Sequence, residues 1–329
     1  MKPVIFFRHI ESDRAEYKAA KEALSVYEQR VLIPRNSLVI PRYSALPNYR
    51  ELEADVRLLG GRLLNTYEEH RFIADIRKYV PVLGDLTPKT WETWGGLPEG
   101  QYVVKGITNS RKQSWNTCMF CPTVADVPKV ASRLMDDAEI LEQGLVVRQY
   151  VPLVQYGVGI NGLPVTNEWR FFVLHDHILA CGYYWVNDTE DYPHSLETPP
   201  QGAVEAVQEA IARIQKASTV PFYVVDVGER ADGGWIVIEL NDGQQSGLPH
   251  LDPFRFYKEL RDRLVVSRYS GFYRSTEGRL HRSPNADDDL LVADLEGVEP
   301  DLDPVLEQDL ATERNRQHTE AEVRLLSNL

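Results

Sequence analysis

The sequence predicts an α/β protein in which a small parallel α/β domain is followed by a mixed α+β region. Residues 1–75 alternate apolar strand-like runs with helical stretches, which is the rhythm of a parallel sheet. Further along, apolar strands follow one another, and Asp232-Gly233 between two of them indicates an antiparallel hairpin. The 329 residues, 43% of them hydrophobic, are enough for a core and for two or three subdomains.

The first section, residues 1–75, is expected to alternate strand and helix. In order, the elements are a strand at Val4–Phe7, a helix near Asp13–Gln29, a strand at Ser37–Pro41, a helix at Tyr49–Leu59 and a strand at Leu63–Asn65. The second helix ends at Gly60-Gly61, because glycine readily adopts the left-handed conformation that closes a helix.

The second section, residues 76–145, is expected to mix helices and strands, and a helix at residues 68–80 leads into it. Its expected elements are a strand at Gln101–Lys105, a polar loop at residues 106–116, a strand at Thr117–Cys121 and a helix near Val124–Met135. Cys118 and Cys121 have the spacing of a redox or zinc pair, but a structural zinc site needs four ligands and no second pair lies nearby. Buried reduced thiols on an apolar strand are the preferred interpretation.

The third section, residues 146–275, is expected to be dominated by antiparallel strands. Its elements are a strand at Leu145–Val151, a hairpin of Trp169–Leu174 and Ile178–Trp185, a helix at Val204–Lys216, a hairpin of Phe222–Val227 and Trp235–Leu240, and a helix at residues 254–265. The helix at Val204–Lys216 is amphipathic, with its apolar side chains on one face.

The charge is concentrated at the C-terminal end. Residues 281–329 hold thirteen Asp and Glu against four Lys and Arg, and so carry most of the net charge of −13. This balance argues against nucleic-acid binding. The tail, residues 276–329, is acidic and poor in aromatics, so we expect a solvated extension, disordered or helical, that could dock a protein partner.

No apolar run is long enough to span a membrane, and the apolar stretch at Val4–Phe7 is too short for a signal peptide. With three cysteines there is no disulfide framework. We therefore expect a cytoplasmic protein without membrane contact.

The last hairpin carries three oxygen-bearing side chains. If Asp232-Gly233 is a two-residue turn, Asp226 lies opposite Glu239, and Asn241 shares the face of Glu239. Mg²⁺ prefers a few oxygen ligands together with phosphate and water, which fits two carboxylates and an amide. The alternative is an ordinary solvated face, but acids at the ends of apolar strands are costly unless paired or metal-bound.

Three further segments carry cations or polar groups. Lys105 ends an apolar strand, and its loop, with Ser110, Arg111 and Lys112, suits phosphate binding, although surface loops are often basic and no P-loop or Rossmann pattern is present. Arg148-Gln149-Tyr150-Val151 breaks a strand, so its backbone could bind an adenine edge or simply form a sheet edge.

Arg170 lies in the middle of an apolar strand and needs an anionic partner. That partner is either a ligand phosphate or carboxylate, or Glu168, two residues away on the same face.

Taken in order, these segments resemble the ATP-grasp superfamily over about residues 36–262. SLVIPRYSALPNYRELEADVRLLGGRLLN resembles the domain that precedes the grasp, VVKG with its loop the N-terminal lobe, VVRQYV the hinge, and WRFFVL with the D…E-x-N hairpin the C-terminal lobe. Ser110-Arg111-Lys112, Arg148 and the ending ELNDGQQSGL are most similar to the divergent clade that includes the cell-division protein CDC-123 and the R2K relatives.

The resemblance implies an ATP-grasp fold, in which two lobes clasp ATP behind a pre-grasp domain. It divides the chain into a pre-grasp domain (residues 1–75), an N-terminal lobe (76–145), a C-terminal lobe (146–275) and the tail.

The resemblance also implies a role for each candidate residue. The implied roles are α/β-phosphate binding for Lys105, β/γ-phosphate cover for Ser110 with Arg111 or Lys112, adenine contact for Gln149, Tyr150 and Val151 beside Arg148, γ-phosphate or acyl-phosphate contact for Arg170, and Mg²⁺ binding for Asp226, Glu239 and Asn241. A further upstream cation is expected, with Arg77 and Lys78 as candidates. The hinge lacks the acid that many relatives place there for the ribose.

The first hypothesis for function is an ATP-dependent carboxylate–amine ligase that uses ATP and Mg²⁺, with Lys105 and Arg170 as catalytic cations. Its partners would be a carboxylate and an amine: an amino acid, a peptide or a protein. The alternatives are an ATP-binding assembly factor of the CDC-123 type and a kinase-like phosphotransferase. Residues 152–168 and 186–200 are candidate cover loops; His194 and His250 either face a substrate or are solvated loop residues.

Overall fold

The computed structural model describes residues 1–8, 14–185, 198–270, 272–274 and 280–282. The chain forms two compact units, Met1–Arg261 and Asp262–Leu329. Most of the predicted tail, and residues 186–197 of one predicted cover loop with His194, lie outside the described residues. The predicted division at residues 75, 145 and 275 stays a prediction.

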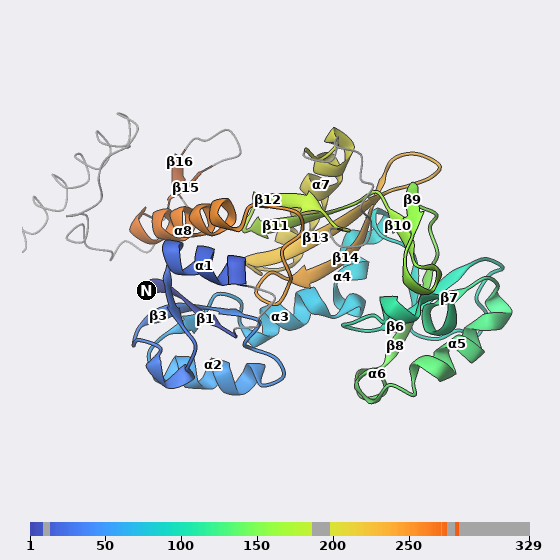
Figure 1. The fold of residues 1–329 in the computed structure, drawn as a ribbon, viewed down its shortest axis with the longest axis horizontal. Coiled ribbons are helices and arrows are strands. Elements are labelled where there is room, and N and C mark those ends of the chain that lie inside the picture. Colours follow the sequence, from blue (N-terminus) through green and yellow to red (C-terminus); the bar gives the residue numbers. More distant parts are fainter. Residues whose placement is uncertain (9–13, 186–197, 271, 275–279, 283–329) are drawn as a thin grey trace, which may run out of the picture. The chain divides into compact units, whose positions relative to one another are not determined.

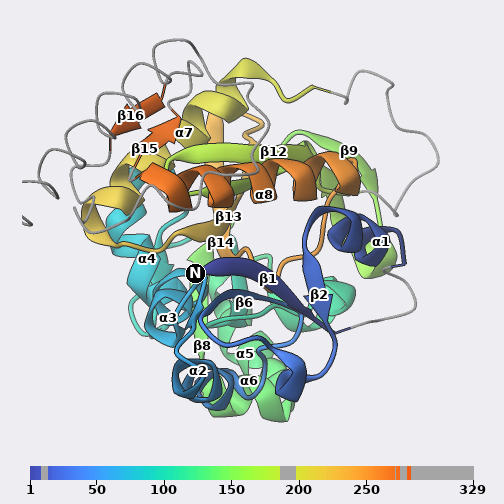
Figure 2. The same ribbon diagram turned by 90° about the vertical axis from the view of Figure 1, so that its left-hand side faces the viewer.

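The first unit begins with a four-stranded parallel sheet in the order β2-β1-β3-β4 (Figures 1 and 2). Its elements are β1 (Lys2–Phe7), α1 (Arg14–Ala23), β2 (Ser25–Tyr27), the 3₁₀ turn η2 (Arg30–Leu32), β3 (Ser37–Arg42), α2 (Tyr49–Leu58) and β4 (Arg62–Leu63). The parallel sheet expected from the sequence is confirmed. The first helix is shorter than expected, because the chain turns at Leu24 into β2.

The helix expected at residues 68–80 is broken into α3 (Tyr67–Ala74) and α4 (Ile76–Leu83). Asp75 has an extended backbone between them and caps α4 by accepting a hydrogen bond from the N–H of Arg77 (3.1 Å). Its buried carboxylate also forms ion pairs with the guanidinium groups of Arg71 (2.8 Å) and Arg77 (2.7 Å). Asp75 therefore ends one helix and begins the next.

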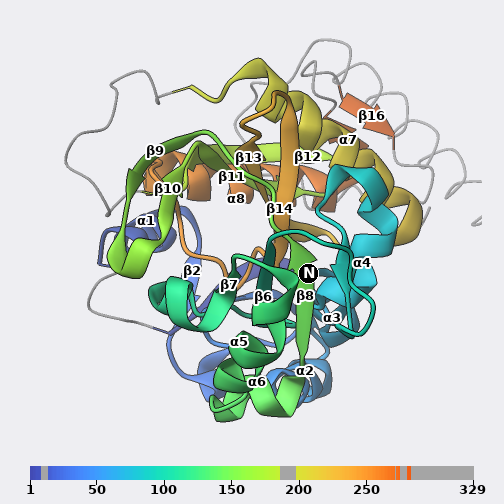
Figure 3. The same ribbon diagram turned by 90° about the vertical axis from the view of Figure 1, so that its right-hand side faces the viewer.

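A second sheet, in the order β5-β8-β6-β7, is antiparallel (Figure 3). Its elements, with the helices beside it, are η3 (Gly84–Leu86), β5 (Thr90–Trp91), β6 (Tyr102–Gly106), η4 (Lys112–Ser114), the π-helical turn η5 (Trp115–Met119), β7 (Phe120–Cys121), η6 (Val124–Asp126), α5 (Val127–Leu134), α6 (Ala138–Gln143) and β8 (Leu145–Gln149). The strand expected at Thr117–Cys121 is wrong in its first half, because those residues form the π-helical turn.

A third sheet, in the order β12-β11-β13-β14, is also antiparallel. The elements of this part are β9 (Gln155–Val158), η7 (Ile160–Gly162), β10 (Pro164–Thr166), β11 (Glu168–Leu174), β12 (His177–Tyr183), α7 (Gln201–Ala217), β13 (Phe222–Glu229) and β14 (Trp235–Asp242). Strands β9 and β10 form a separate two-stranded ribbon. Both hairpins expected from the sequence are confirmed.

The two faces of this third sheet differ in character. One face carries apolar side chains such as Trp169, Phe171 and Val225, which pack with the apolar face of α7 in the largest core cluster. The residues between them in sequence, including Arg170 and Asp226, lie on the opposite face. That face is polar where Glu168, Arg170 and Asp226 lie, whereas Phe172 and Phe222 on the same face pack with Phe256. The polar part is called the polar side of the sheet below.

Helix α8 (Pro253–Ser270) begins in the first unit and continues into the second. The second unit also contains an antiparallel pair, β15 (Phe272–Arg274) and β16 (Leu280–Arg282). Among the described residues, no helix combines the length and the apolar character needed to cross a lipid bilayer.

The turn of the β13–β14 hairpin is longer than the sequence predicts. Glu229 pairs with Trp235, and Arg230 donates its N–H to the carbonyl of Gly234 (2.9 Å), so the loop contains three residues, 231–233, in place of the two-residue Asp232-Gly233. Gly233 has a φ of 99°, which is the left-handed conformation that such a loop requires. This turn alone would shift the register of the hairpin by one residue.

A β-bulge cancels that shift. The register changes between Asp226, opposite Glu239, and Val227, opposite Val237, so that Ile238 is an extra residue on β14. Val237 stays in the core, whereas Ile238 and Glu239 both line the cavity described below. In a regular strand two consecutive residues would face opposite sides.

Candidate functional site

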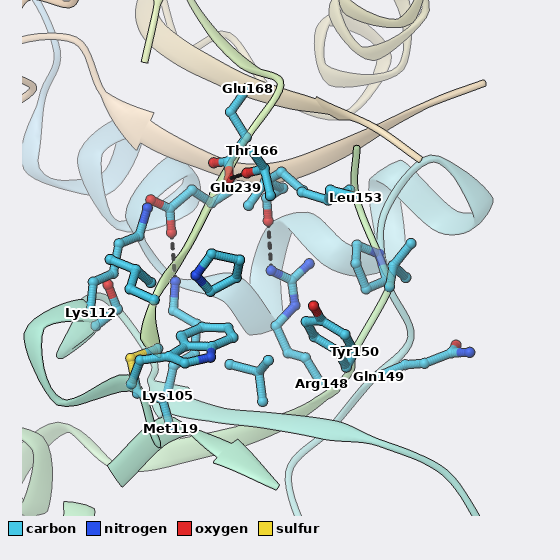
Figure 4. Close-up of a pocket in the computed structure, with 18 of the residues that line it drawn as sticks. Lys105, Lys112, Met119, Arg148, Gln149, Tyr150, Leu153, Thr166, Glu168 and Glu239 are labelled. Carbon is cyan, nitrogen blue, oxygen red and sulfur yellow. Dashed lines mark hydrogen bonds and ion pairs between the residues drawn. The ribbon is translucent and has the colours of Figure 1, made fainter. Parts of the chain in front are cut away.

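A cavity lies between the second sheet and the polar side of the third (Figure 4). Its empty volume is about 770 Å³, open solvent included, which is in the size range of small-molecule sites. The residues that line it are Pro88, Val103, Lys105, Ser110, Lys112, Trp115, Met119, Arg148, Gln149, Tyr150, Val151, Leu153, Leu163, Pro164, Thr166, Glu168, Trp185, Ile238 and Glu239.

Most of the predicted site residues meet at this cavity. Those on its lining are Lys105, Ser110, Lys112, Arg148, Gln149, Tyr150, Val151 and Glu239. Of the other four, Arg170, Asp226 and Asn241 lie beside Glu239 on the same sheet. Only Arg111 is engaged elsewhere: it forms ion pairs with Asp137 (2.6 Å) and Glu139 (2.8 Å).

The cavity has a charged side and a largely uncharged side. Figure 4 shows Lys105 and Lys112 on one side and Gln149, Tyr150 and Leu153 on the other. A flat apolar ring fits the uncharged side, and anionic groups fit the lysines. The cavity can therefore hold an elongated ligand with one aromatic and one anionic end.

Lys105, from β6, reaches across the cavity to Glu239, from β14, with its Nζ 2.7 Å from Oε2. The side chain of Lys105 is buried, and that of Glu239 is 14% exposed. Burial alone would raise the pKa of Glu239, but the cations Lys105, Lys112 and Arg170 outweigh it, so the pKa lies well below its ordinary value. Glu239 is therefore an ionised carboxylate.

Arg170, Asp226 and Glu239 form a row across three neighbouring strands. The Nε and Nη2 atoms of Arg170 each donate to one carboxylate oxygen of Asp226 at 2.8 Å. Asn241 donates to the same carboxylate at 3.4 Å. The partner of Arg170 is thus Asp226, directly opposite, and not Glu168, which the sequence offered as an alternative.

Tyr184 contacts two cations of the site, Lys112 and Arg170, and the sequence does not predict it as a site residue. Lys112 donates to its hydroxyl (2.9 Å), and the guanidinium of Arg170 lies 4.8 Å from its ring centroid. An aromatic ring in contact with two cations stabilises both. No sequence signal marks this role, since Tyr184 follows an ordinary apolar strand.

Glu168 and Thr166 are polar lining residues that were also missed as site residues. Thr166 donates to the carboxylate of Glu168, and burial raises the pKa of that carboxyl. Glu168 is two residues from Arg170, so it lies on the same face. From the sequence, that spacing indicates Glu168 only as one of two alternative partners for Arg170. Trp185, on the same lining, has an indole N–H that no described residue accepts.

Arg148 has a structural role in addition to lining the cavity. It donates to the carbonyl of Ile238 at the bulge (2.6 Å) and to the hydroxyl of Thr87 (2.8 Å). Burial lowers its pKa. In the adjoining hinge, the backbone N–H groups of Gln149 and Tyr150 already donate to carbonyls of the same unit, at 2.9 Å each.

Several other candidates lie away from the cavity lining. Arg77 pairs with Asp75, and Lys78 is exposed, so neither of the two expected upstream cations is on the lining. His250 is exposed. Cys121 is a buried free thiol whose pKa burial raises to about 12.

The residues present fit a magnesium ion bound together with a nucleotide. Within the described ranges, no group of three His, Cys, Asp or Glu forms a self-sufficient metal site. Mg²⁺, however, is commonly held by one or two carboxylates, with phosphate and water supplying the rest. Asp226 and Glu239 are neighbours on adjacent strands, and the amide of Asn241 lies beside them.

The comparisons with known proteins agree with this geometry. The family described as ATP-grasp domain, R2K clade family 3, matches residues 93–260, about half of the chain. The chain belongs to the R2K clade of ATP-grasp proteins. The matched range includes the predicted site residues from Lys105 to Asn241 but not Arg77 and Lys78.

Solved structures of ATP-grasp proteins share the fold. D-cycloserine synthetase DcsG is 14% identical with a TM-score of 0.53, over 80% of this chain and 99% of that one. A RimK domain ATP-grasp protein from Sphaerobacter thermophilus is 14% identical with a TM-score of 0.50, over 80% and 98%. Cdc123 from Schizosaccharomyces pombe is 13% identical with a TM-score of 0.36, over 51% of this chain and 83% of that one. No curated protein matches the sequence.

Proposed function

We propose that the protein is an ATP-dependent ligase that joins a carboxylate to an amine through an acyl phosphate. The observation that supports this most is the row of Arg170, Asp226 and Glu239 facing Lys105 across one cavity. This arrangement places cations that can bind a triphosphate beside carboxylates that can bind the metal ion of the nucleotide. Of two solved structures that share the fold, one is named a D-cycloserine synthetase and the other an ATP-grasp RimK domain protein.

In this proposal the adenine lies against Tyr150, Val151 and Leu153, and the triphosphate extends towards Lys105 and Lys112. Asp226, Glu239 and Asn241 would hold Mg²⁺, which neutralises phosphate charge and orients the γ-phosphate when bound. Thr166, at the end of β10, and Glu168, at the start of β11, are hydrogen-bonded to each other on the cavity lining, so they would bind the ribose hydroxyls in place of an acid at the hinge.

The reaction has two displacement steps. The substrate carboxylate attacks the γ-phosphorus and ADP leaves; an amine then attacks the acyl carbon and phosphate leaves, which forms the amide. Arg170 and Lys105 stabilise the charge that develops on the transferred group. Such transfer depends on positioning and charge, so no nucleophilic side chain is required.

The test is to incubate the protein with Mg-ATP and defined mixtures of amino acids and peptides, and to measure ADP, phosphate and new amides. ADP and phosphate release that requires both an acid and an amine is the expected result. Tight ATP binding without turnover in any mixture would instead indicate an assembly factor. A stable phosphorylated product would indicate a kinase.

A further inference from the structure

On the charged side of the cavity, the cations and the carboxylates form ion pairs with each other. Lys105 pairs with Glu239 at 2.7 Å, and Arg170 pairs with Asp226 through two hydrogen bonds of 2.8 Å. Each pair joins a cation that the proposed function assigns to phosphate with a carboxylate that it assigns to the metal. The groups assigned to phosphate and those assigned to the metal are therefore paired with each other in this structure.

We propose that the nucleotide must displace these cations before the carboxylates can bind the metal, so that ATP and Mg²⁺ bind through an exchange of ion pairs. The inference rests on the proposed function, because it concerns the same site. Mg²⁺ alone would meet carboxylates whose charge is already cancelled. It would also have to leave Lys105 or Arg170 buried without an anionic partner, which is strongly unfavourable.

The triphosphate removes that cost. Its oxygens offer new anionic partners to Lys105 and Arg170 in the same cavity, so each cation keeps a counter-charge when it leaves its carboxylate. The released carboxylates then carry uncompensated negative charge, which favours a divalent cation. Each ligand thus improves the site for the other, and this coupling is reciprocal.

The Lys105–Glu239 pair is the one that a ligand reaches first. Both of its residues line the cavity, whereas Arg170 and Asp226 do not. Lys112 also lines the cavity but donates to the hydroxyl of Tyr184 and forms no ion pair within the described part of the chain. Lys112 can therefore meet the phosphate without releasing a carboxylate.

This difference between two lysines supplies a matched experiment. Mn²⁺, as a paramagnetic substitute for Mg²⁺, is titrated into the full-length, nucleotide-free protein, and free Mn²⁺ is measured by electron paramagnetic resonance. The wild type should bind Mn²⁺ weakly, and Lys105→Met should bind it about tenfold more tightly because Glu239 is released. Lys112→Met also removes a positive charge near Glu239 but releases no carboxylate, so its gain in affinity should be at most about a third of that in Lys105→Met.

A measurement on the wild type alone keeps the test independent of variant folding. In the presence of the non-hydrolysable analogue AMP-PNP, bound Mn²⁺ should appear in the protein complex at concentrations where the nucleotide-free protein binds none. Equal Mn²⁺ affinity with and without the analogue would overturn the exchange. So would equal gains in Lys105→Met and Lys112→Met, or no gain in a Lys105→Met protein whose thermal melting shows that it is folded.

These outcomes separate the exchange from the proposed function. If the analogue complex binds Mn²⁺ tightly but the lysine variants do not differ, only the exchange is wrong. If no Mn²⁺ is bound even with the analogue, the metal site itself is wrong and the exchange falls with it.

Discussion

At the scale of single residues, the function depends on two carboxylates that lie side by side on adjacent strands. Asp226→Asn and Glu239→Gln keep the shape of each side chain but remove its charge. Either change should lower Mg²⁺-dependent ATP turnover at least about a hundredfold, because the metal loses an anionic ligand. ADP release measures this effect. Glu209→Gln, which alters an exposed ion pair on α7, is the control and should keep normal turnover.

Full activity in both variants, measured beside a fully active Glu209→Gln control, would show that Asp226 and Glu239 do not hold the metal. Circular dichroism of each variant distinguishes loss of the metal from loss of the fold.

The ionisation of Glu239 also predicts a pH dependence of stability. Its pKa in the folded protein is lowered, chiefly because Lys105 and the other cations outweigh the effect of burial. A carboxyl whose folded pKa is lowered stabilises the protein above its ordinary pKa, about 4.5, and this contribution is lost as the pH falls below that value. The difference in melting temperature between wild type and Glu239→Gln should therefore shrink below about pH 4.5.

Thermal melts of the two proteins from pH 3.5 to 7.5 check this expectation. A difference that grows as the pH falls would contradict an ionised Glu239 paired with Lys105.

At the scale of elements, the bulge on β14 and Arg148 depend on each other. The bulge turns the carbonyl of Ile238 towards Arg148, which donates to it and to Thr87. Arg148→Lys keeps a buried charge but cannot reach both acceptors, because lysine has no planar fork of donors. We expect it to lose about 2 kcal/mol of unfolding free energy.

Urea denaturation measures this loss, with Arg133→Lys as the control, because Arg133 lies on an exposed part of α5. If the two variants lose the same amount, Arg148 does not support the bulge.

The same hairpin shows which features of the site can be predicted from the sequence. Asp226 was placed opposite Glu239 by assuming a two-residue turn, and that pairing is confirmed. The turn itself has three residues, and the bulge at Ile238 restores the register. Neither feature could be predicted, because a bulge depends on contacts from Arg148 and Thr87, which lie far away in the sequence. The correct pairing therefore rests partly on two errors that cancel.

Contacts between elements were the least predictable part of the site. The Lys105 loop and the hinge were recognised because each has its own local pattern of charge and apolar residues. The hydrogen bonds from Lys105 to Glu239 and from Arg170 to Asp226 join strands that are distant in sequence. The local pattern of apolar and polar residues cannot predict such pairs. Tyr184 was missed for the same reason.

At the scale of the whole molecule, all the described residues on the cavity lining lie from position 88 to position 239. Deleting residues 283–329 should therefore leave the affinity for ATP within about twofold of that of the full chain. Calorimetric titration of both proteins with Mg-AMP-PNP checks this. A folded truncation that no longer binds the analogue would show that the tail contributes to the site.

The central claim is that the cavity between the two sheets binds Mg-ATP through Lys105 and the carboxylates opposite it. The most direct measurement is calorimetric titration of the full-length wild type, of Lys105→Met and of the exposed-lysine control Lys129→Met with Mg-AMP-PNP. The account predicts one saturable site in the wild type and in Lys129→Met, and at least about tenfold weaker binding in Lys105→Met. Absence of binding to the wild type at millimolar analogue, or equal binding by all three proteins, would contradict it.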